Sequence, residues 1–311
     1  MNLFATVLTK KQPCANYRGE AELNRAVIQK VTDGKFDYPI FSPESMRNAL
    51  REILAGEGYN LPSNRSRLND EEQLAVKFAD YPDPDKFIDD YFFGYLVAAS
   101  GKDRKEIEKL LAEKRGKTHQ FAFKRDSVLR MNLAKALEPY RHNAVFTQSP
   151  LDATAKDVKK HSNATTSALL HRETVVSAFQ YPFALALADC KPKPEWTRKL
   201  LQAIGELNGV AGNHARSYFE MAPESIIVRL TPSLVAGYQT YGFKADGSPP
   251  DVLTDILADY YPGKEFYLGG EIVKRGLTKE LADGLTVKGV TLDGDPQRLL
   301  ATVAEKFLGG K

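Results

Sequence analysis

The sequence predicts an α+β domain of the ferredoxin-like or RRM-like type, enlarged by an insertion. With the insertion set aside, strand and helix signals follow one another as strand, helix, strand, projecting arm, strand, helix and strand. This order is typical of a four-stranded antiparallel sheet backed by two helices. The length of 311 residues also exceeds that of a usual single core. It favours a core domain with a large insertion or a second lobe.

Composition excludes several classes of protein. Hydrophobic residues make up 42% of the chain, and no apolar run approaches the ~20 residues of a membrane helix. The N-terminus lacks the features of a signal peptide, so we expect a cytoplasmic protein without a membrane partner. Cys14 and Cys190 are the only cysteines, and their spacing indicates neither a disulfide scaffold nor a zinc site. The formal net charge is only +3, so positive charge that binds a polyanion must be concentrated on one part of the surface.

The chain opens with a strand and a helix. Residues 1–10 are largely apolar on both alternating faces, which indicates a central strand. A helix is expected after Ser42, which is suited to cap it, because Pro43 fits the first helical position and Glu44 complements the helix dipole.

Arg47 and Arg51 lie four residues apart, so they share one face of this helix. A helix N-terminus beside two arginines is a candidate phosphate site. A solvated helix face, with Arg51 paired to neighbouring acids, explains the same pattern, and both interpretations stay open.

The segment 56–121 is the expected insertion. It is highly charged, and we predict it to be mostly helical with a break at residues 81–85, which read YPDPD. The apolar cluster DDYFFGYLVA, residues 89–98, is expected to return the chain to the core. The helix predicted over residues 102–117 is rich in both signs of charge, as a solvated helix is.

Strands are expected in residues 121–150, and a polar tract follows over residues 151–166. The tract has almost no large apolar side chain, so it is expected to project from the body. Its lysines suit a polyanion, although a merely solvated loop has the same composition. Residues 172–189 give the longest strand signal. Pro182 within them predicts a position at the sheet margin or at a bulge.

Residues 195–232 combine a helix, a polar loop and a strand, and the rest of the chain is organised around them. The apolar spacing of Trp196, Leu200, Ile204 and Leu207 predicts an amphipathic helix, and residues 225–231 alternate as a strand. In the loop, glycines permit sharp turns, and an asparagine, a histidine and an arginine offer donors to phosphate, ribose or base edges. A helix end with a polar surface loop is the simpler alternative. Helices are also predicted over 250–261 and 295–308.

Three stretches together resemble a known family. They are FSPESMRNALREIL at 41–54, DDYFFGYL at 89–96 followed by FKRDSVLRMN at 123–132, and VAGNHARSYFEMAPESIIVRLTP at 210–232. In order and spacing they are similar to the backbone subunit of type I CRISPR Cascade complexes, in particular the DevR-type subunit of subtype I-B within the RAMP superfamily. The similarity covers roughly residues 2–234 and is looser beyond.

The resemblance implies an RRM-like palm, a helical finger insertion and a β-hairpin thumb. Members of the family stack head to tail along a guide RNA, or crRNA, and the thumb of one subunit crosses the RNA held by its neighbour. The implied divisions are palm 1–55, finger 56–121, palm 122–150, thumb 151–171, palm 172–234, and a C-terminal extension 235–311 packed on the palm.

The resemblance also implies the residues that contact RNA. No catalytic residue, metal ligand or cofactor is implied, and the sequence shows no nucleophile and base pair with recognisable spacing. A subunit repeated along a guide is expected to hold the RNA backbone and leave discrimination to base pairing. The implied contacts are Ser42, Ser45, Arg47, Asn48 and Arg51, Lys124 and Arg125, Lys159, Lys160, His161 and Asn163, and Gly212, Asn213, His214 and Arg216.

The implied partners are the crRNA, the target DNA strand paired with it, further copies of this chain, and the cap, large, small and crRNA-processing subunits of Cascade. A transposition adaptor joins them in transposon-associated systems, which this sequence does not distinguish from interference systems. One alternative is an RNA-guided RNA nuclease, as in type III relatives. It needs an acidic residue, such as Asp33 or Asp37, beside each base that a thumb displaces at regular intervals along the guide. Another is an unrelated enzyme with His214 as general base.

Overall fold

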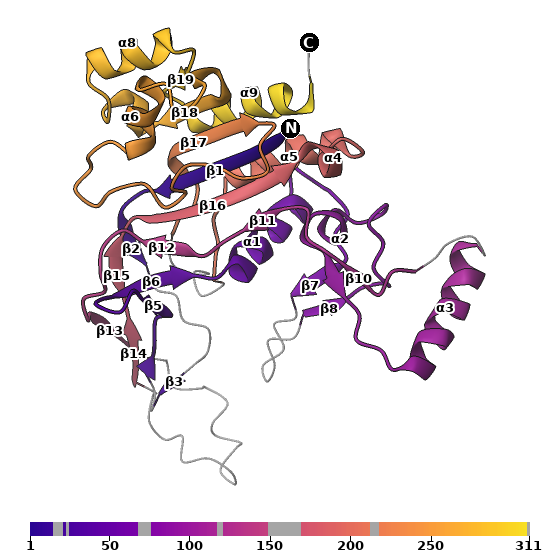
Figure 1. The fold of residues 1–311 in the computed structure, drawn as a ribbon. Helices are drawn as coiled ribbons and strands as arrows, with labels where there is room; N and C mark the ends of the chain where they lie inside the picture. The colour runs from indigo at the N-terminus through magenta and orange to yellow at the C-terminus, as the bar shows by residue number, and fades with distance from the viewer. Residues whose placement is uncertain are drawn as a thin grey trace.

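A mixed α+β body carries two arms that extend to the same side, as Figure 1 shows. The structure is a computed structural model, and it describes residues 1–14, 21–22, 25–67, 76–116, 121–148, 169–211 and 218–309. The predicted α+β class is confirmed.

The central strand is β1 (Asn2–Thr9), as predicted. It lies between β16 (Phe179–Ala186) and β17 (Pro223–Thr231) and runs antiparallel to both. Both faces of β1 are covered, which explains why the strand is apolar on both sides. The first strand of the chain is therefore held by two strands that come more than 170 residues later.

Further strands extend the sheet in both directions. On one side β16 pairs with β11 (Arg130–Met131) and β12 (Ala134–Ala136), followed by β6 (Asp37–Phe41) and β5 (Lys30–Thr32). On the other side β17 pairs with β18 (Phe266–Gly270), and β18 pairs in parallel with β19 (Thr291–Asp293). The sheet is thus mostly antiparallel.

Pro182 does not place its strand at the margin of the sheet, and that part of the prediction is wrong. β16 is an interior strand, with Pro182 opposite Thr6 of β1. Its carbonyl accepts from the Asn132 amide at 3.2 Å, so its edge without an N–H faces the interruption between β11 and β12. The break in the neighbouring strand removes the need for a donor at this position.

Three helices cover one face of the sheet: α1 (Pro43–Ala55), α5 (Pro194–Gly205) and α9 (Pro296–Leu308). Their apolar faces join Leu3 and Val7 of β1 in one core cluster. Burial of each large apolar side chain there stabilises the fold by about 1.5–3 kcal/mol relative to its exposure. The helices predicted from Trp196 and within 295–308 are confirmed. The short α4 (Leu187–Cys190) connects β16 to α5.

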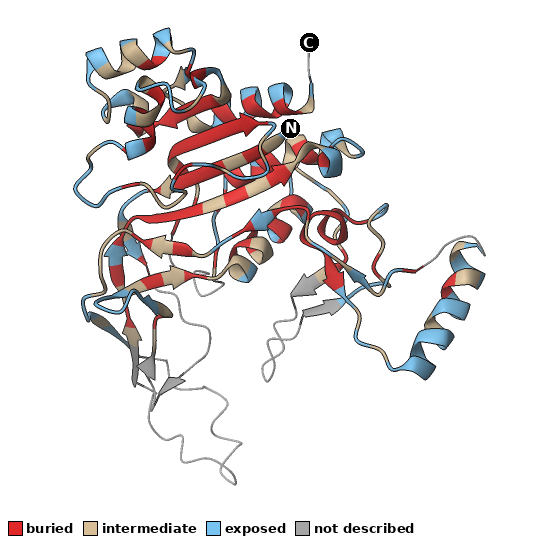
Figure 2. Cartoon of the chain, in the orientation of Figure 1, coloured by how far each residue is buried: buried red, intermediate tan, exposed pale blue. Residues whose placement is uncertain are grey.

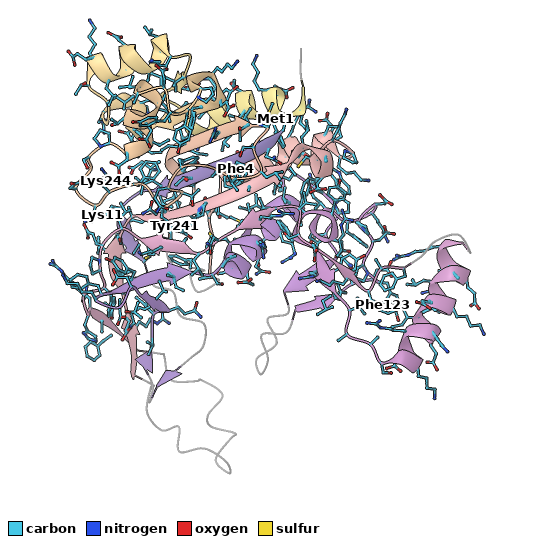
Figure 3. All side chains as sticks on the ribbon, viewed as in Figure 1. Met1, Phe4, Lys11, Phe123, Tyr241 and Lys244 are labelled. Carbon is cyan, nitrogen blue, oxygen red and sulfur yellow. The ribbon has the colours of Figure 1, made fainter. Side chains whose placement is uncertain are left out.

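The opposite face of the sheet is covered by the chain segment that follows β17. Thr6 Oγ1 donates to the Thr240 carbonyl at 2.9 Å, and the side-chain amide of Gln180 bonds both backbone groups of Phe243. Tyr241 reaches across to the Leu133 carbonyl at 2.7 Å (Figure 3). The sheet therefore has no open face at these strands.

A C-terminal lobe continues from this cover and has a core cluster of its own. Sequence reasoning predicted α6 within 250–261 but missed the other short elements, because their pairing partners are distant in the sequence. The lobe comprises α6 (Asp251–Leu257), the 3-10 helix η2 (Gly263–Glu265), α7 (Glu271–Lys274) and α8 (Lys279–Val287), besides β18 and β19.

The first arm lies within the segment predicted as the finger. The prediction of a mostly helical segment is wrong for part of it, because β7 (Arg65–Arg67) and β8 (Val76–Phe78) form an antiparallel pair. The helices are α2 (Ile88–Phe93) and α3 (Gly101–Arg115), and β9 (Tyr95–Leu96) pairs with β10 (Lys124–Arg125). As predicted, α2 is buried in the core, whereas α3 is largely exposed (Figure 2).

The second arm is built on a hairpin. β13 (Ala144–Gln148) pairs antiparallel with β14 (Leu169–Glu173), and β14 pairs with β4 (Arg25–Ala26), which pairs with β3 (Ala21–Glu22). Near its base β15 (Val175–Ser177) pairs with β2 (Gln12–Cys14). β13 precedes the predicted thumb of residues 151–171, and β14 overlaps its end, since their pairing extends from residue 144 to residue 173.

Cys14 and Cys190 are both buried, with free thiols. Burial raises the pKa of each thiol to about 12. Within the described ranges, no helix is both long and apolar enough to cross a membrane.

Candidate nucleic-acid interface

The N-terminus of α1 is built as the sequence predicts. Ser42 Oγ accepts from the Ser45 amide at 3.2 Å, and Pro43 occupies the first helical turn. In Figure 1 this helix lies between the two arms, since it follows β6 on the side of the hairpin arm and leads into the finger arm. The partial positive charge of a helix N-terminus is therefore presented between the arms.

Arg47 lies on the first turns of α1 and is partly exposed. Its Nη1 is 3.8 Å from Glu44 Oε1, and its Nε is buried without a hydrogen-bond partner in the described part of the chain. Burial lowers the pKa of this guanidinium, and the charge of Glu44 opposes the shift. An unpaired buried donor costs free energy. An anion bound against Arg47 would offset that cost.

Arg51, one turn further on, is committed to the protein. Its side chain is buried, and Nε donates to Asp89 Oδ2 at 3.1 Å. Its Nη1 donates to Asn48 Oδ1 at 3.1 Å, which orients Asn48 on the exposed side of the helix. Arg51 is therefore paired with an acid, as the alternative interpretation expected, but its part of the helix is buried and not solvated.

Asp89 and Asp90 join α1 to the finger arm. Asp89 accepts from Arg51 and from the backbone amides of Asn64 and Arg65, at 2.8 and 3.0 Å. Asp90 accepts from Asn64 Nδ2 at 2.8 Å. Burial raises the pKa of Asp90. We define these contacts as the finger base.

Sequence reasoning missed the finger base. A signal for it was present, because two adjacent acids inside the apolar cluster at 88–96 are expected to be buried and hydrogen-bonded.

Lys124 and Arg125 lie on β10. Lys124 is exposed, with its Nζ 3.3 Å from Asp126 Oδ1. Arg125 instead packs over the ring of Tyr91, 4.9 Å from its centroid, and its Nε is buried without a hydrogen-bond partner among the described residues. The two neighbours therefore differ, with Lys124 facing solvent and Arg125 held against α2.

The predicted thumb and loop contacts fall outside the described residues. Gly209 lies at the start of this loop. Its φ of 65° is the positive value that a glycine turn adopts. Beside it lies a groove of about 730 Å³ that includes Lys10 and Glu220, whose Nζ and Oε2 are 2.9 Å apart. The predicted contacts not described are Lys159, Lys160, His161, Asn163, Gly212, Asn213, His214 and Arg216.

Asp33 and Asp37, the acids considered for a nuclease, occupy ordinary structural positions. Asp33 Oδ1 accepts from the amides of Lys35 and Phe36 at 2.9 and 2.8 Å, and these hydrogen bonds lower the pKa of Asp33. Asp37 begins β6, and its carbonyl accepts from the Tyr140 amide. No group of three potential metal ligands occurs among the residues that the structure describes.

Fold and site together define a class: an α+β protein with a central, mostly antiparallel sheet, two arms on one side, and a capped helix N-terminus with a partly exposed arginine between them. No family model matches the chain.

Comparison with known proteins narrows this class. A curated relative, "CRISPR-associated protein Cas7/Cst2/DevR" from Myxococcus xanthus (strain DK1622), is 29% identical over 290 residues, which cover 88% of each chain. Two solved structures, titled "CRISPR RNA-guided surveillance complex" and "CRISPR RNA-guided surveillance complex, pre-nicking", contain chains with a similar fold. Each has a TM-score of 0.56 and covers 98% of this chain and 99% of its own, at 10% and 12% identity. The resemblance predicted from the sequence is confirmed.

Proposed function

We propose that this chain is the guide-RNA-binding backbone subunit of a CRISPR surveillance complex of type I, similar to subtype I-B. The observation that carries the proposal is the match to the Cas7/Cst2/DevR protein, which extends over 88% of both chains. A match of this extent includes the central sheet, not one local motif. The similar folds within RNA-guided surveillance complexes support the same assignment.

The proposed palm is RRM-like. Its strands stand in the order β17, β1, β16 and β11 with β12, each antiparallel to its neighbour, and α1 and α5 lie on one face. The hairpin of β13 and β14 lies in the chain between β12 and β16, and we assign it to the thumb. The insertion that contains α2 and α3 is the finger, and the lobe after residue 234 is the extension packed on the palm.

The N-terminus of α1 is the proposed binding site for the RNA backbone. Ser42, Ser45, Arg47 and Asn48 lie on its first turns, and helix amides with an arginine are suited to phosphate. We assign Arg51 a positioning role, because it holds Asn48 and Asp89. The remaining proposed contacts are Lys124, Arg125, Lys159, Lys160, His161, Asn163, Gly212, Asn213, His214 and Arg216.

The covered sheet face supports a role in holding the RNA backbone. RRM domains stack bases on aromatic residues of an open sheet face. Here Tyr238, Thr240 and Phe243 occupy that face. The subunit is thus proposed to grip phosphates and to leave sequence discrimination to base pairing between guide and target DNA.

The proposed assembly is a head-to-tail filament along the crRNA. Such a filament requires a heterologous interface, in which different surfaces of successive copies meet. Its further proposed partners are the target DNA strand and the cap, large, small and crRNA-processing subunits, with a transposition adaptor in a transposon-associated form. The low net charge reduces repulsion between adjacent copies.

The proposed subunit performs no catalysis. A nuclease of the type III kind would need an acidic side chain directed at the RNA, whereas the carboxylate of Asp33 accepts hydrogen bonds from its own turn. No observation on the described residues favours the nuclease or the enzyme with His214 as base.

Arg47→Ala tests the proposed function. Binding of single-stranded RNA is expected to weaken regardless of its sequence, and the log–log salt slope to flatten by about 0.7 for the lost phosphate contact. Arg275→Ala, which removes an exposed arginine of the C-terminal lobe, is the matched control. If the Arg47 variant binds RNA as tightly as the wild type and with the same salt slope, the N-terminus of α1 is not the binding site. A wild-type chain that binds no RNA would contradict the function.

A further inference from the structure

A groove of about 900 Å³ lies where the hairpin arm joins the central sheet. Its walls come from four places in the chain: Lys11 between β1 and β2, Phe36 in the turn before β6, the connection 138–143 that leads into β13, and Val175 with Val176 in β15. Figure 3 shows Lys11 at this end of the sheet. None of these residues is among the contacts proposed above.

The groove presents aromatic surface to solvent. Phe36 is 44% exposed although it is a large apolar side chain, and a tight turn holds it there. Its amide donates to Asp33 Oδ1 at 2.8 Å, and its carbonyl accepts from the Asp33 amide at 3.1 Å. The rings of Tyr140 and His142 meet edge to face further along the groove, with centroids 6.5 Å apart. These rings give the groove flat surfaces on which a base can stack.

Cations lie beside these rings. Arg141 is exposed and forms no ion pair within the described part of the chain. Lys11 Nζ lies 2.6 Å from Glu138 Oε1, but both side chains are about half exposed, so this pair is weak and Lys11 can turn to another anion. Lys35 Nζ lies 5.1 Å from the centroid of the Phe36 ring. Cations interleaved with aromatic rings are typical of grooves for single-stranded nucleic acid.

The walls of the groove are fixed by the protein. The Tyr140 amide donates to the Asp37 carbonyl at 2.7 Å, and the Thr174 amide donates to the Asn143 carbonyl at 2.9 Å. Lys30 Nζ lies over the Tyr140 ring at 4.1 Å and donates to the buried Glu173 at 3.2 Å. A ligand therefore meets a preformed surface and loses little free energy to ordering it.

We propose that this groove binds unpaired nucleotides of a single-stranded nucleic acid, with a base stacked on Phe36 and phosphates held by Arg141 and Lys11. The ligand class rests on the proposed function, whereas the groove is separate from the N-terminus of α1. A groove that held only a phosphate would not need exposed Phe36. A groove that held an apolar protein segment would not need Arg141, an exposed cation without an ion pair among the described residues.

Two substitutions in the full-length chain separate stacking from charge. The probes are labelled oligouridylate RNA and oligothymidylate DNA, each with one 2-aminopurine whose fluorescence is quenched on stacking. Phe36→Ala is expected to weaken binding roughly 5- to 150-fold and to remove the quenching without changing the salt slope. Phe36→Trp is expected to restore both. Arg141→Ala is expected to flatten the salt slope by about 0.7 and to leave the quenching in place.

Matched controls lie on the C-terminal lobe. Tyr260→Ala removes an exposed aromatic ring, and Arg275→Ala removes an exposed arginine, so both are expected to behave like the wild type. Preference for the RNA or the DNA probe identifies the strand that occupies the groove.

Three outcomes would overturn the inference. If Phe36→Ala and Arg141→Ala bind like the wild type while Arg47→Ala binds weakly, the groove is not a binding site but the proposed function stands. If the groove variants lose self-association and retain nucleic-acid binding, the groove is a protein interface. If the wild-type chain binds neither probe, the inference and the proposed function both fail.

Discussion

The two arms are attached to the sheet by the same device in two different environments. At the finger base, Asp89 is buried and accepts from Arg51 and two backbone amides. At the hairpin arm, Glu173 is buried and accepts from Lys30 and the Ile28 amide, which we define as the thumb base. The cations differ in exposure, since the side chain of Arg51 is 8% exposed and that of Lys30 is 22% exposed.

The second difference is in the number of buried carboxylates. Asp90 lies next to Asp89, and burial raises its pKa. Burial alone would also raise the pKa of Glu173, but hydrogen bonds from the Ile28 amide and Lys30 outweigh it, so its pKa lies below the usual value. The carboxylates and the cation of the finger base are therefore more deeply buried, and their burial costs more free energy. The ion pair of the thumb base is more exposed to solvent and costs less to bury.

The largest expected effect is that of Arg51→Met. It leaves Asp89 buried without its cation, so the free energy of unfolding is expected to fall by about 3–5 kcal/mol. The matched change at the thumb base is Lys30→Met, for which we expect about 1 kcal/mol or less, because solvent reaches that pair. Urea unfolding followed by circular dichroism measures both. Equal losses would show that the two anchors are alike.

The second prediction compares a glycine of the finger arm with a glycine in the turn between β5 and β6. In Gly94→Ala the new Cβ would lie 2.4 Å from the Arg125 carbonyl oxygen at a φ of +66°, so we expect a loss of about 2–4 kcal/mol. Gly34 has a φ of +93° and open space around it, so Gly34→Ala is expected to lose only about 1–2 kcal/mol. Thermal unfolding of the two variants gives the order, and a larger loss at Gly34 would contradict it.

Glu173→Gln tests the thumb base alone. The substitution replaces charged hydrogen bonds with neutral ones, and we expect a loss of about 1.5–3 kcal/mol. Hydrogen exchange of the Ile28 amide is expected to accelerate in this variant, because that amide donates to Glu173. Exchange of amides in α2 serves as the internal control. Faster exchange in α2 as well would mean that the arms do not open independently.

The smallest effects appear in the dependence of stability on pH. The native pKa of Asp90 is raised. Its contribution to the free energy of unfolding is therefore fully present below about pH 4 and is lost as the pH rises through that native pKa. Glu173 has a lowered pKa, so its contribution is present above about pH 4.3 and is lost as the pH falls through the native pKa.

Two variants separate these opposite trends. Relative to the wild type, Asp90→Asn is expected to gain stability as the pH rises from about 3 to about 7, and Glu173→Gln is expected to lose it. Each pKa unit corresponds to about 1.4 kcal/mol. Urea unfolding at a series of pH values measures the two slopes. Slopes of the same sign would refute the assigned pKa directions.

Local patterns predicted much of the fold. The cap at Ser42, the stripe through Leu200 and Ile204, and the helix with Leu299 each depend on residues within one or two turns, and each is present. The pairing of β17 with β18 and the insertion hairpin of β7 and β8 were missed, because a short strand is defined by its partner.

Long-range contacts limited the prediction of the candidate site. Spacing places Arg47 and Arg51 on one face of a helix, and only the contact with Asp89, 38 residues away, separates their roles. The groove at Phe36 was likewise invisible, since its walls come from four distant segments.

β1 pairs with two strands that are made much later than β1 itself. This strand is made before both of its neighbours, which are residues 179–186 and 223–231. At about 5–20 residues per second, the ribosome reaches β17 roughly 10 to 45 s after it has made β1. Until β16 is made, the apolar strand has neither partner in the sheet, and until β17 is made it has one at most. During synthesis, this apolar strand of eight residues must therefore stay incompletely paired until both of its partner strands have been made.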